Sequence, residues 1–573
     1  MRRFASIDFL RGIAIVLMIF LHVILHVLDI NGMLAQINDI PMVNIVAFII
    51  LPFLGGLAGF FLMVSAIGNM ISMYRHLQAG KSVKDLIIRQ IMGGVLLLIF
   101  AMISESILGI HGIIPNLMRS LNDVSGWDWS PILYRGYHFE TIHTIAWCII
   151  LNGIVQGILS RKGGWKNPKK LLKIYIILIV VIVALTPLMW WLVDLAIPGY
   201  PWADWLINPI NGNPVDVQYP FLGVSEWWKF ITHFFFAAIA GKEEPLFPYL
   251  AVSFMGSILG IILAQPREVV REKWLKLPKR TMKIGFIMFL IGSIGLAINL
   301  ILLMVEVNID AALNLYKGLA FHRNWVPENP DIPSSILPVL GWLFQFLSLN
   351  GAAICLIMVV VRVVEFRGRG KKFADKTRFF RRFGFVAFTM YNLQWIYLFI
   401  WFLISTLIYG TPYLPLDWAG TFLTMAITFL ILHGLLLLWE RAKYKGSLEW
   451  TMGTIAAQII PARKVKDKWW KSGQLNVEEA FYNAEWLNII EKDEIAHDKL
   501  GDSKFAYKMS FFGFLFFPIS FITFIIARGS MRTEQKNKYN NRGKIISLIG
   551  IIFFLTWLVI SIIFSLSDLG ISL

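Results

Sequence analysis

The sequence has little charge and very little cysteine for its 573 residues. Charged residues make up 16% of the chain and hydrophobic residues 57%, a balance that excludes an ordinary soluble domain and is typical of a polytopic membrane protein. The two cysteines, Cys148 and Cys355, both fall in long apolar runs. We therefore expect buried small hydrophobic side chains at these positions, and neither a disulfide framework nor a metal site.

Acidic residues are scarce relative to basic ones. The chain has 36 Asp and Glu against 53 Lys and Arg, a net charge of +17. We do not infer a nucleic-acid partner from this excess, because the basic clusters lie in loops between apolar runs, where they are typical of cytoplasmic loops. We expect an integral protein of the cell membrane, in contact with membrane lipid, whose N-terminus is cytoplasmic. We expect no cleavable signal, because the first apolar run is too long and lacks a small-residue cleavage site.

Apolar runs of spanning length recur along the chain and predict an all-α, polytopic helical bundle of about ten core transmembrane helices. The runs lie near residues 8–29, 42–72, 86–110, 139–160, 173–195, 245–265, 282–305, 336–361, 382–408 and 416–439.

The character of the chain changes after this core, which we place at residues 1–455. Residues 456–508 are charged and amphipathic and predict a cytoplasmic helical segment. Residues 509–573 hold two further apolar stretches and predict a two-helix hydrophobic hairpin. Simple alternation of spans puts the basic loop of this hairpin outside, against the positive-inside rule. Either one span is miscounted, or the pair is a shallow hairpin that returns to the cytoplasmic side.

Two ionisable residues, Arg11 and His22, lie inside the first apolar run. Ionisable side chains at membrane depth are costly and are functional-site hypotheses by default. Their spacing advances an α-helix by about three turns, so both side chains leave the same face, about 16 Å apart along the axis. This arrangement suits a long anionic ligand that binds Arg11 and whose reactive end reaches the imidazole of His22.

The run from Ser6 to His22 resembles the N-terminal signature of the transmembrane acyltransferase superfamily. That superfamily includes the acyltransferase-three sugar O-acyltransferases, the heparan-alpha-glucosaminide N-acetyltransferases and related uncharacterised bacterial membrane proteins. Four later segments also resemble motifs of these families, in matching order: Phe53–Ser65, Glu140–Ala146, Arg382–Gln394 and Gly446–Trp450. The resemblance covers roughly residues 1–455.

The resemblance implies an acyl-CoA-dependent transmembrane acyltransferase. Such an enzyme moves an acetyl or other acyl group from cytoplasmic acyl-CoA, with acetyl-CoA the expected donor, to a sugar or glycan acceptor on the extracytoplasmic side. We expect no metal. The heparan-type branch carries a catalytic His in the loop after the first span, where this chain has no His beyond His26. The choice between O- and N-acylation therefore stays open.

Histidine suits the general base of acyl transfer, because its pKa lies near neutrality. Three histidines are candidates: His22, His26 one turn further along the same face, and His143 near the outer end of the fourth run, with Glu140 one turn away. The structural alternative for each is a hydrogen bond between helices, a role that we also expect for Tyr391, Asn392 and Gln394.

Arginine is well matched to phosphate through its planar set of donors. The candidates for holding the phosphates of acyl-CoA are Arg11, Arg75 and Arg382. For Arg11 the structural alternative is an ion pair with Asp8 on the same helix.

Two other classes of function fit the same residues. A transporter or flippase for a glycan or lipid-linked intermediate would use the buried His and Arg to line a proton or substrate path. A membrane scaffold would use them only for packing. Internal repeats with broken helices would favour the transporter, and the sequence has no convincing repeat.

The distribution of charge predicts the topology. Lys166 and Asn213 lie in loops that we place on opposite sides of the membrane. Single cysteines at these two positions should therefore react with a membrane-impermeant reagent from opposite sides. Labelling of both from one side would mean that the spans between them are miscounted.

Overall fold

The structure is a computed structural model of the full chain. It describes residues 3–30, 32, 56–109, 112–119, 141–196, 234–236, 238–241, 244–306, 341–459, 475–490, 501–514 and 517–568. Across these ranges the regular structure is helical, and the only β-type pairings are two isolated bridges. The predicted all-α class is confirmed.

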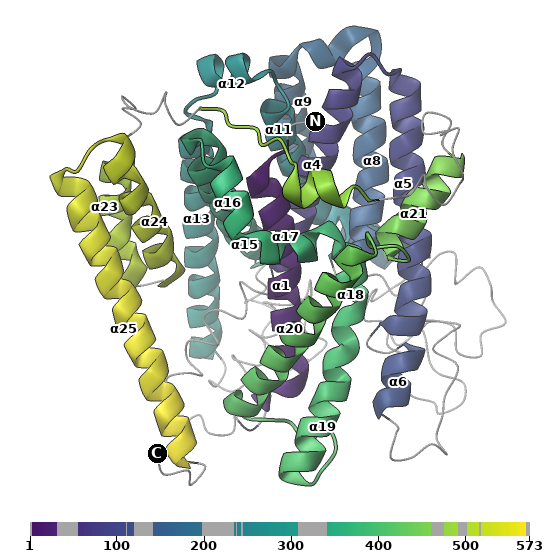
Figure 1. Ribbon diagram of the computed structural model, residues 1–573. Helices are drawn as coiled ribbons and strands as arrows, with labels where there is room; N and C mark the ends of the chain where they lie inside the picture. Colours follow the sequence, from purple (N-terminus) through teal and green to yellow (C-terminus); the bar gives the residue numbers. More distant parts are fainter. Residues whose placement is uncertain are drawn as a thin grey trace.

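Nine helical segments of the described ranges are long and apolar enough to cross a membrane, and Figure 1 shows them running side by side as an upright bundle. The chain is therefore a polytopic helical membrane protein. Its long helices include α1 (Ala5–Val27), α5 (Val83–Leu108), α8 (Thr141–Ser160), α9 (Pro168–Ala196), α11 (Leu246–Leu263), α13 (Leu277–Glu306), α15 (Gly341–Val364) and α20 (Trp418–Arg441).

The predicted run near 42–72 corresponds to α4 (Leu57–Gln78), which is not among the nine. The structure describes this run only from residue 56 on. The helix is nevertheless central, since it packs on α1 and α11 and fully buries Met63 and Ile67. Residues 42–55 of the predicted run lie outside the described ranges.

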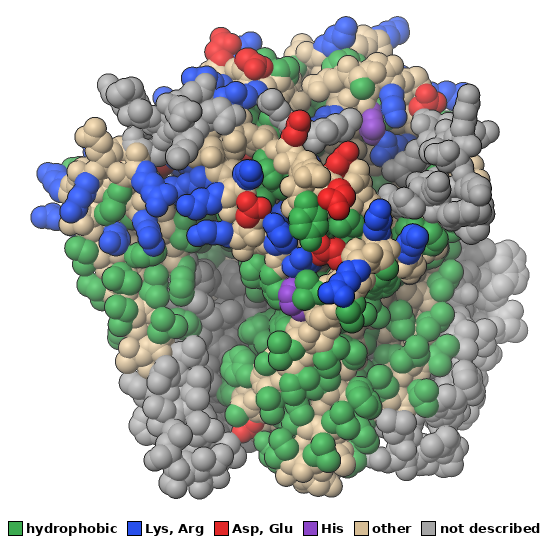
Figure 2. All heavy atoms as spheres, viewed as in Figure 1, with side chains coloured by type: hydrophobic (Ala, Val, Ile, Leu, Met, Phe, Trp, Pro, Cys, Tyr) green, Lys and Arg blue, Asp and Glu red, His purple; other side chains and the backbone are tan. Residues whose placement is uncertain are grey.

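Basic side chains gather at the end of the bundle where α1 begins, which we name the basic end. Figure 2 shows Lys and Arg over the upper part of the face drawn, above a broad band of hydrophobic side chains. Among the exposed apolar side chains are Ile284 and Ile291 of α13 and Leu430 and Leu438 of α20, each more than half accessible. A continuous apolar surface of this kind faces lipid in a membrane protein.

The central helix α1 makes its closest approach to α17 (Arg378–Phe385) at a pair of glycines. A Cβ at Gly384 would lie 2.6 Å from the backbone nitrogen of Gly12, and a Cβ at Gly12 would overlap the carbonyl oxygen of Phe380. Only glycine, which has no Cβ, lets the two backbones come this close. The crossing therefore fixes α17 against the first turns of α1.

The predicted run near 382–408 is an interrupted helix. After α17, Val386 leaves the helical conformation with φ −122° and ψ 53°. The chain then continues through α18 (Ala387–Leu393) and the short 3-10 turn η7 (Gln394–Ile396) into α19 (Tyr397–Tyr409). The break lies beside α1, at the level of the bundle where Arg11 and His22 were predicted to act.

The break is stabilised by a buried carboxylate. Glu449, at the start of α21 (Leu448–Ile459), accepts hydrogen bonds from the backbone N–H of Phe388 at 2.7 Å and from the hydroxyl of Thr389 at 2.5 Å. The first N–H groups of a helix have no partner within the helix, and Glu449 supplies one for α18. Burial raises the pKa of the Glu449 carboxyl.

Residues 475–490, which we name the strap, cross the basic end. They contain one π-helical turn, Glu478–Tyr482, and are otherwise irregular, where the sequence predicted a helical segment. The backbone N–H of Arg3 donates to the carbonyl of Glu485 at 2.7 Å, and the N–H of Leu487 donates to the carbonyl of Arg3 at 2.8 Å. The strap is thus joined to the start of α1 and belongs to the core.

Three helices form the terminal unit: α23 (Asp502–Ser510), α24 (Phe517–Thr533) and α25 (Lys538–Asp568). The last two correspond to the two predicted apolar stretches. The predicted boundary after residue 508 falls inside α23. Figure 1 shows α23 and α24 at the basic end and the long α25 running to the opposite end. Because α24 returns before α25 begins, the basic loop between them lies with the other basic loops. The helix α25 then runs to the opposite end, so the pair does not return to the basic end as a shallow hairpin.

One carboxylate joins the terminal unit to the core. Asp502, at the start of α23, has a side chain only 5% exposed and forms ion pairs with Arg362 of α15 and with Arg367 just beyond that helix. Both guanidinium groups are equally buried. A buried pair of this kind is costly to break, because removing one partner leaves its counterpart uncompensated.

Replacing Asp502 with Asn should therefore destabilise the protein by about 3–5 kcal/mol, measured as unfolding of the detergent-purified chain. Asp375→Asn is the matched control, because Asp375 pairs with Arg378 at 3.5 Å across one exposed helical turn, and such pairs contribute about 0–1 kcal/mol. Equal losses for the two variants would contradict a structural role for Asp502.

Candidate functional site

A small cavity at the basic end lies between α1, α17 and the strap. It has an empty volume of about 220 Å³ and is lined by Arg3, Asp8, Arg11, Arg381, Gly384, Phe385 and Phe481. We name it the arginine cavity. Three guanidinium groups and one carboxylate surround it, so its net charge is positive. Guanidinium groups bind phosphate and carboxylate through paired N–H donors, and the cavity therefore suits an anion.

The one carboxylate of the cavity is already paired. Asp8 accepts from Nε of Arg3 at 3.0 Å and from its Nη2 at 2.9 Å, whereas the sequence offered an Asp8–Arg11 pair. The guanidinium of Arg11 makes no hydrogen bond or ion pair with any other residue in the described ranges. It lies against Gly68 of α4, where a Cβ would be 2.9 Å from Nη2. The N–H donors of Arg11 are therefore not used by other described residues.

Arg381 forms the opposite wall of the cavity. Its guanidinium donates to the carbonyls of Ala374 and Ala480 and stacks over the ring of Trp486, 4.4 Å from the ring centre. Its Nε has no hydrogen-bond partner within the described part of the chain. Burial lowers the pKa of Arg381 to about 10. An anion in the cavity would favour the charged form of this guanidinium.

The other two predicted phosphate-binding arginines lie differently. Arg75, near the end of α4, stacks over Phe4, 5.5 Å from the ring centre, and is within electrostatic reach of Arg3 and Asp8. It is a neighbour of the arginine cavity. Arg382 points to α20, where its Nε donates to Glu440 at 2.6 Å. The structure therefore brings Arg11 and Arg75 together and puts Arg381, not Arg382, on the cavity wall.

The predicted histidine pair lies deeper along α1, against the interrupted helix. The Nδ1 of His22 is 2.8 Å from Oε1 of Gln394, and the ring stacks on Trp395 with 5.3 Å between ring centres and 11° between planes. His26 is hydrogen-bonded through Nδ1 to the hydroxyl of Tyr397. Gln394, Trp395 and Tyr397 thus hold both imidazoles from one segment of the chain.

These contacts set the state of the His22 ring. An amide oxygen only accepts, so with Oε1 of Gln394 as the neighbour the proton is assigned to Nδ1. Nε2 then carries the lone pair and is the nitrogen that a general base uses. The Nε2 of Gln394 is buried and has no hydrogen-bond partner within the described ranges, which makes it a candidate donor to an oxyanion.

His143 belongs to another part of the bundle. It is 1% exposed on α8, which packs mainly on α5 and also on α4 and α11. Beside it, the hydroxyl of Thr144 donates to the carbonyl of Glu244 at 2.6 Å. The structure places His143 in a helix group different from that of His22 and His26. Glu140, its predicted neighbour, lies outside the described residues.

Packed apolar side chains separate the arginine cavity from the histidine pair. Ile15 and Ile19 lie on the same face of α1 as Arg11 and His22 and are fully buried. They belong to the hydrophobic cluster that also contains Met390 of α18. The two sites are therefore aligned along one helix pair over about 16 Å, with a closed apolar seam between them.

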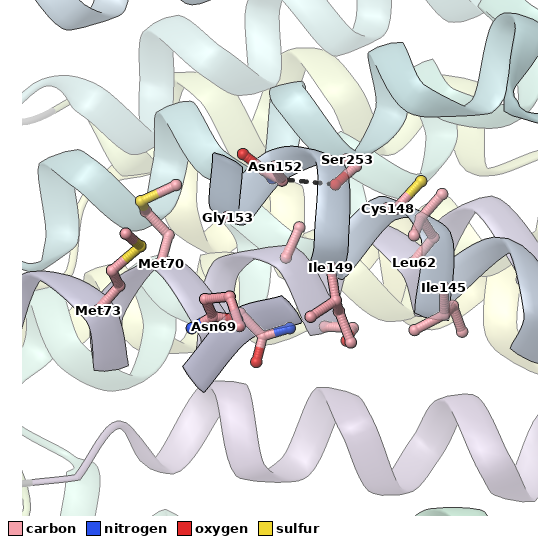
Figure 3. A pocket seen from close by; sticks show the side chains of 13 residues that line it. Leu62, Asn69, Met70, Met73, Ile145, Cys148, Ile149, Asn152, Gly153 and Ser253 are labelled. Atoms are coloured by element: carbon pink, nitrogen blue, oxygen red, sulfur yellow. Dashed lines mark hydrogen bonds between the residues drawn. The ribbon is translucent and has the colours of Figure 1, made fainter. Parts of the chain in front are cut away.

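A second pocket, of about 340 Å³, lies between α4, α5, α8 and α11. In Figure 3 Asn152 of α8 is hydrogen-bonded to Ser253 of α11 on its wall, and Asn69, Met70 and Met73 come from α4. Asn152 also accepts from the hydroxyl of Tyr175 at 3.0 Å. The lining carries no charged side chain, so this pocket does not suit a phosphate. The hydrogen bonds of Asn152 join α8 to α11 and α9.

Sequence reasoning missed Arg3, Arg381, Trp395, Tyr397 and Phe481 as parts of the site. A signal for Arg381 was present. Gly384 lies three residues after it and therefore on the same helix face, whereas Arg382 points to another face. A glycine in a helix often marks close approach of a second backbone. The face that carries Gly384 was thus the one to expect against α1.

We compared the chain with protein-family models, with curated proteins and with solved structures, and none of them matches it.

Proposed function

We propose that the protein is an acyl-CoA-dependent membrane acyltransferase that moves an acetyl or other acyl group to a sugar or glycan acceptor. One observation carries the proposal. The arginine cavity, which has N–H donors that no described residue uses, lies between α1 and the interrupted helix. The histidine pair lies deeper in the bundle between the same two elements. We take the basic end to be cytoplasmic, because Lys and Arg accumulate there.

The arginine cavity would receive the phosphates of the donor. Arg11 and Arg381 supply N–H groups that other described residues do not use, and Asp8 orients Arg3. Charge-assisted hydrogen bonds of this type contribute more than neutral ones. The neutral pantetheine arm and the thioester of acyl-CoA would then extend along α1 toward His22.

His22 would act as the general base. Its Nε2 takes the proton from the acceptor hydroxyl or amine while the acceptor oxygen or nitrogen attacks the thioester carbonyl. The N–H of Gln394 supports the negative charge that forms on the carbonyl oxygen. The carbon–sulfur bond then breaks, the acyl group stays on the acceptor, and the leaving thiolate takes the proton from the imidazolium. The other two candidate bases are His26 and His143.

The closed apolar contact between α1 and α18 requires a movement during the reaction. Ile15 and Ile19 must separate from α18 before a thioester can lie beside His22. The break at Val386 is where the interrupted helix can bend. The same break favours the second candidate function, a transporter or flippase, because interrupted helices often form substrate sites in transporters.

Substitutions at Arg11 and His22 test whether Arg11 binds the donor and His22 acts as the general base. Arg11→Gln should weaken acyl-CoA binding about 10- to 100-fold, since one charge-assisted contact is lost. His22→Ala should leave acyl-CoA binding nearly intact and lower turnover about 10²- to 10⁴-fold. Binding and turnover are measured on the purified protein with labelled acetyl-CoA and extracted envelope glycans.

Arg378→Gln is the matched control, because Arg378 lies on the same short helix as Arg381 but outside the cavity lining. It should bind and turn over like the unmodified protein. A folded His22→Ala variant with full turnover would move the base to His26 or His143. Acceptor flux without any acyl transfer would favour the transporter.

The strap changes what we expect of truncation. If residues 456–508 were a segment separate from the core, as the sequence predicts, a chain ending near Arg463 should still bind acyl-CoA. Phe481 lines the arginine cavity and Trp486 stacks on Arg381, so we now expect weaker binding after this truncation. Phe481→Ala should weaken binding as well, whereas Tyr482→Phe, at a half-exposed neighbour, should not. Full affinity in a stable truncated chain would remove the strap from the site.

A further inference from the structure

The seam between the terminal unit and the core carries more arginine than its acids can balance. Arg362 and Arg367 share the carboxylate of Asp502. Two further arginines lie there, Arg369 just after α15 and Arg532 near the end of α24. Their guanidinium groups form no hydrogen bond or ion pair with any other residue that the structure describes. Two cations in this seam therefore lack a counter-charge from the described chain.

The guanidinium groups of Arg369 and Arg532 both lie at α24. A Cβ at Gly529 of α24 would lie 3.6 Å from Nη2 of Arg369, and Arg532 is one helical turn after Gly529. Burial lowers the pKa of Arg369, and the charges of Arg532 and Arg367 lower it further. The two groups repel each other across the seam, and a bound anion would remove this repulsion.

The part of the terminal unit at the basic end has no spare acid to supply that anion. Residues 501–544 contain two acidic residues, Asp502 and Glu534. Asp502 is paired with the core, and Glu534 accepts from the backbone N–H of Asp502 at 2.5 Å and from the hydroxyl of Ser503 at 2.5 Å. Eight basic residues remain on the same stretch: Lys504, Lys508, Arg528, Arg532, Lys536, Lys538, Arg542 and Lys544.

The surface beside these charges is apolar and aromatic. Phe511, Phe512 and Phe514 of the turn after α23 are 40–52% exposed, and Phe521 and Ile525 of α24 are 39% and 47% exposed. On the side of Figure 2 where this unit lies, blue side chains stand directly above green ones. A ligand that fits has an anionic group joined to apolar chains.

We propose that the phosphate of an anionic phospholipid binds between Arg369 and Arg532, with its acyl chains along the exposed face of α24. The lipid then links the terminal unit to the core as Asp502 does, through charge. Basic pockets between membrane helices at the cytoplasmic surface bind anionic headgroups in this way. The proposal does not depend on the acyltransferase assignment.

The experiment measures thermal unfolding of the delipidated, detergent-purified full chain during titration with phosphatidylglycerol. A ligand that binds only the folded state raises the unfolding temperature, and we expect an increase of a few degrees. Phosphatidylcholine and inorganic phosphate at the same concentrations should give little increase, because one lacks the net charge and the other the acyl chains. Equal increases with phosphatidylcholine, or a full increase with phosphate alone, would overturn the proposal.

A double variant, Arg369→Gln with Arg532→Gln, makes the test specific. Without lipid it should unfold at the same temperature as the unmodified protein or higher, since a repulsion has been removed. It should lose most of its response to phosphatidylglycerol. The control, Arg161→Gln with Lys162→Gln, neutralises two exposed cations elsewhere at the basic end and should keep the response.

Two outcomes contradict the site. A double variant that keeps the full response shows that the lipid binds elsewhere. A double variant that is less stable than the unmodified protein without lipid shows that the arginines have a structural role within the chain. If the double variant does not fold, Arg532→Gln alone is used, because Arg532 is exposed and its loss should still halve the response or more.

Discussion

The backbone contact between Gly12 and Gly384 is the constraint from which the candidate site follows. Helices normally pack with their axes 8–10 Å apart because side chains keep them separated. Here neither residue has a Cβ, and a Cβ on either one would strike backbone atoms of the facing helix. The side chains that flank the contact, Arg11 on one helix and Arg381 on the other, are thereby held around one small cavity.

The same contact sets the register further along the pair. His22 and Gln394 are separated by 372 residues in the chain, the same separation as between Gly12 and Gly384. α1 and the interrupted helix therefore run parallel to each other and keep the same residue register from the arginine cavity to the histidine pair. This register is maintained despite the break at Val386, because Glu449 accepts a hydrogen bond from the backbone N–H of Phe388 in the first turn of α18. A helix pair of this kind holds a binding group and a proton acceptor at a fixed distance.

Much of the fold and part of the site could be predicted from the sequence. Long apolar runs specify membrane helices strongly, since a bilayer leaves few alternatives, and Arg11 and His22 were evident because charge at that depth is rare. The choice of Arg381 over Arg382 depended on which helix face meets α1. That face is set by a contact between segments far apart in the chain.

The strap and the terminal unit were harder to predict for a related reason. The composition of residues 475–490 is typical of a solvated amphipathic helix, but backbone pairing with Arg3 and burial of Phe481 override local preference. Asp502 illustrates the same point, since an acid in a basic tail has no visible partner until α15 brings Arg362 beside it. Local pattern identifies helices, whereas tertiary contacts decide which polar residues meet.

The constant register has a consequence for how this protein can change over evolutionary time. An α-helix turns by about 100° per residue, so one inserted or deleted residue between Gly12 and His22 would leave Arg11 in its cavity and rotate the imidazole away from Gln394. A compensating change in the interrupted helix would have to occur at the same time. The stretch from Gly12 to His22 is therefore held to one length.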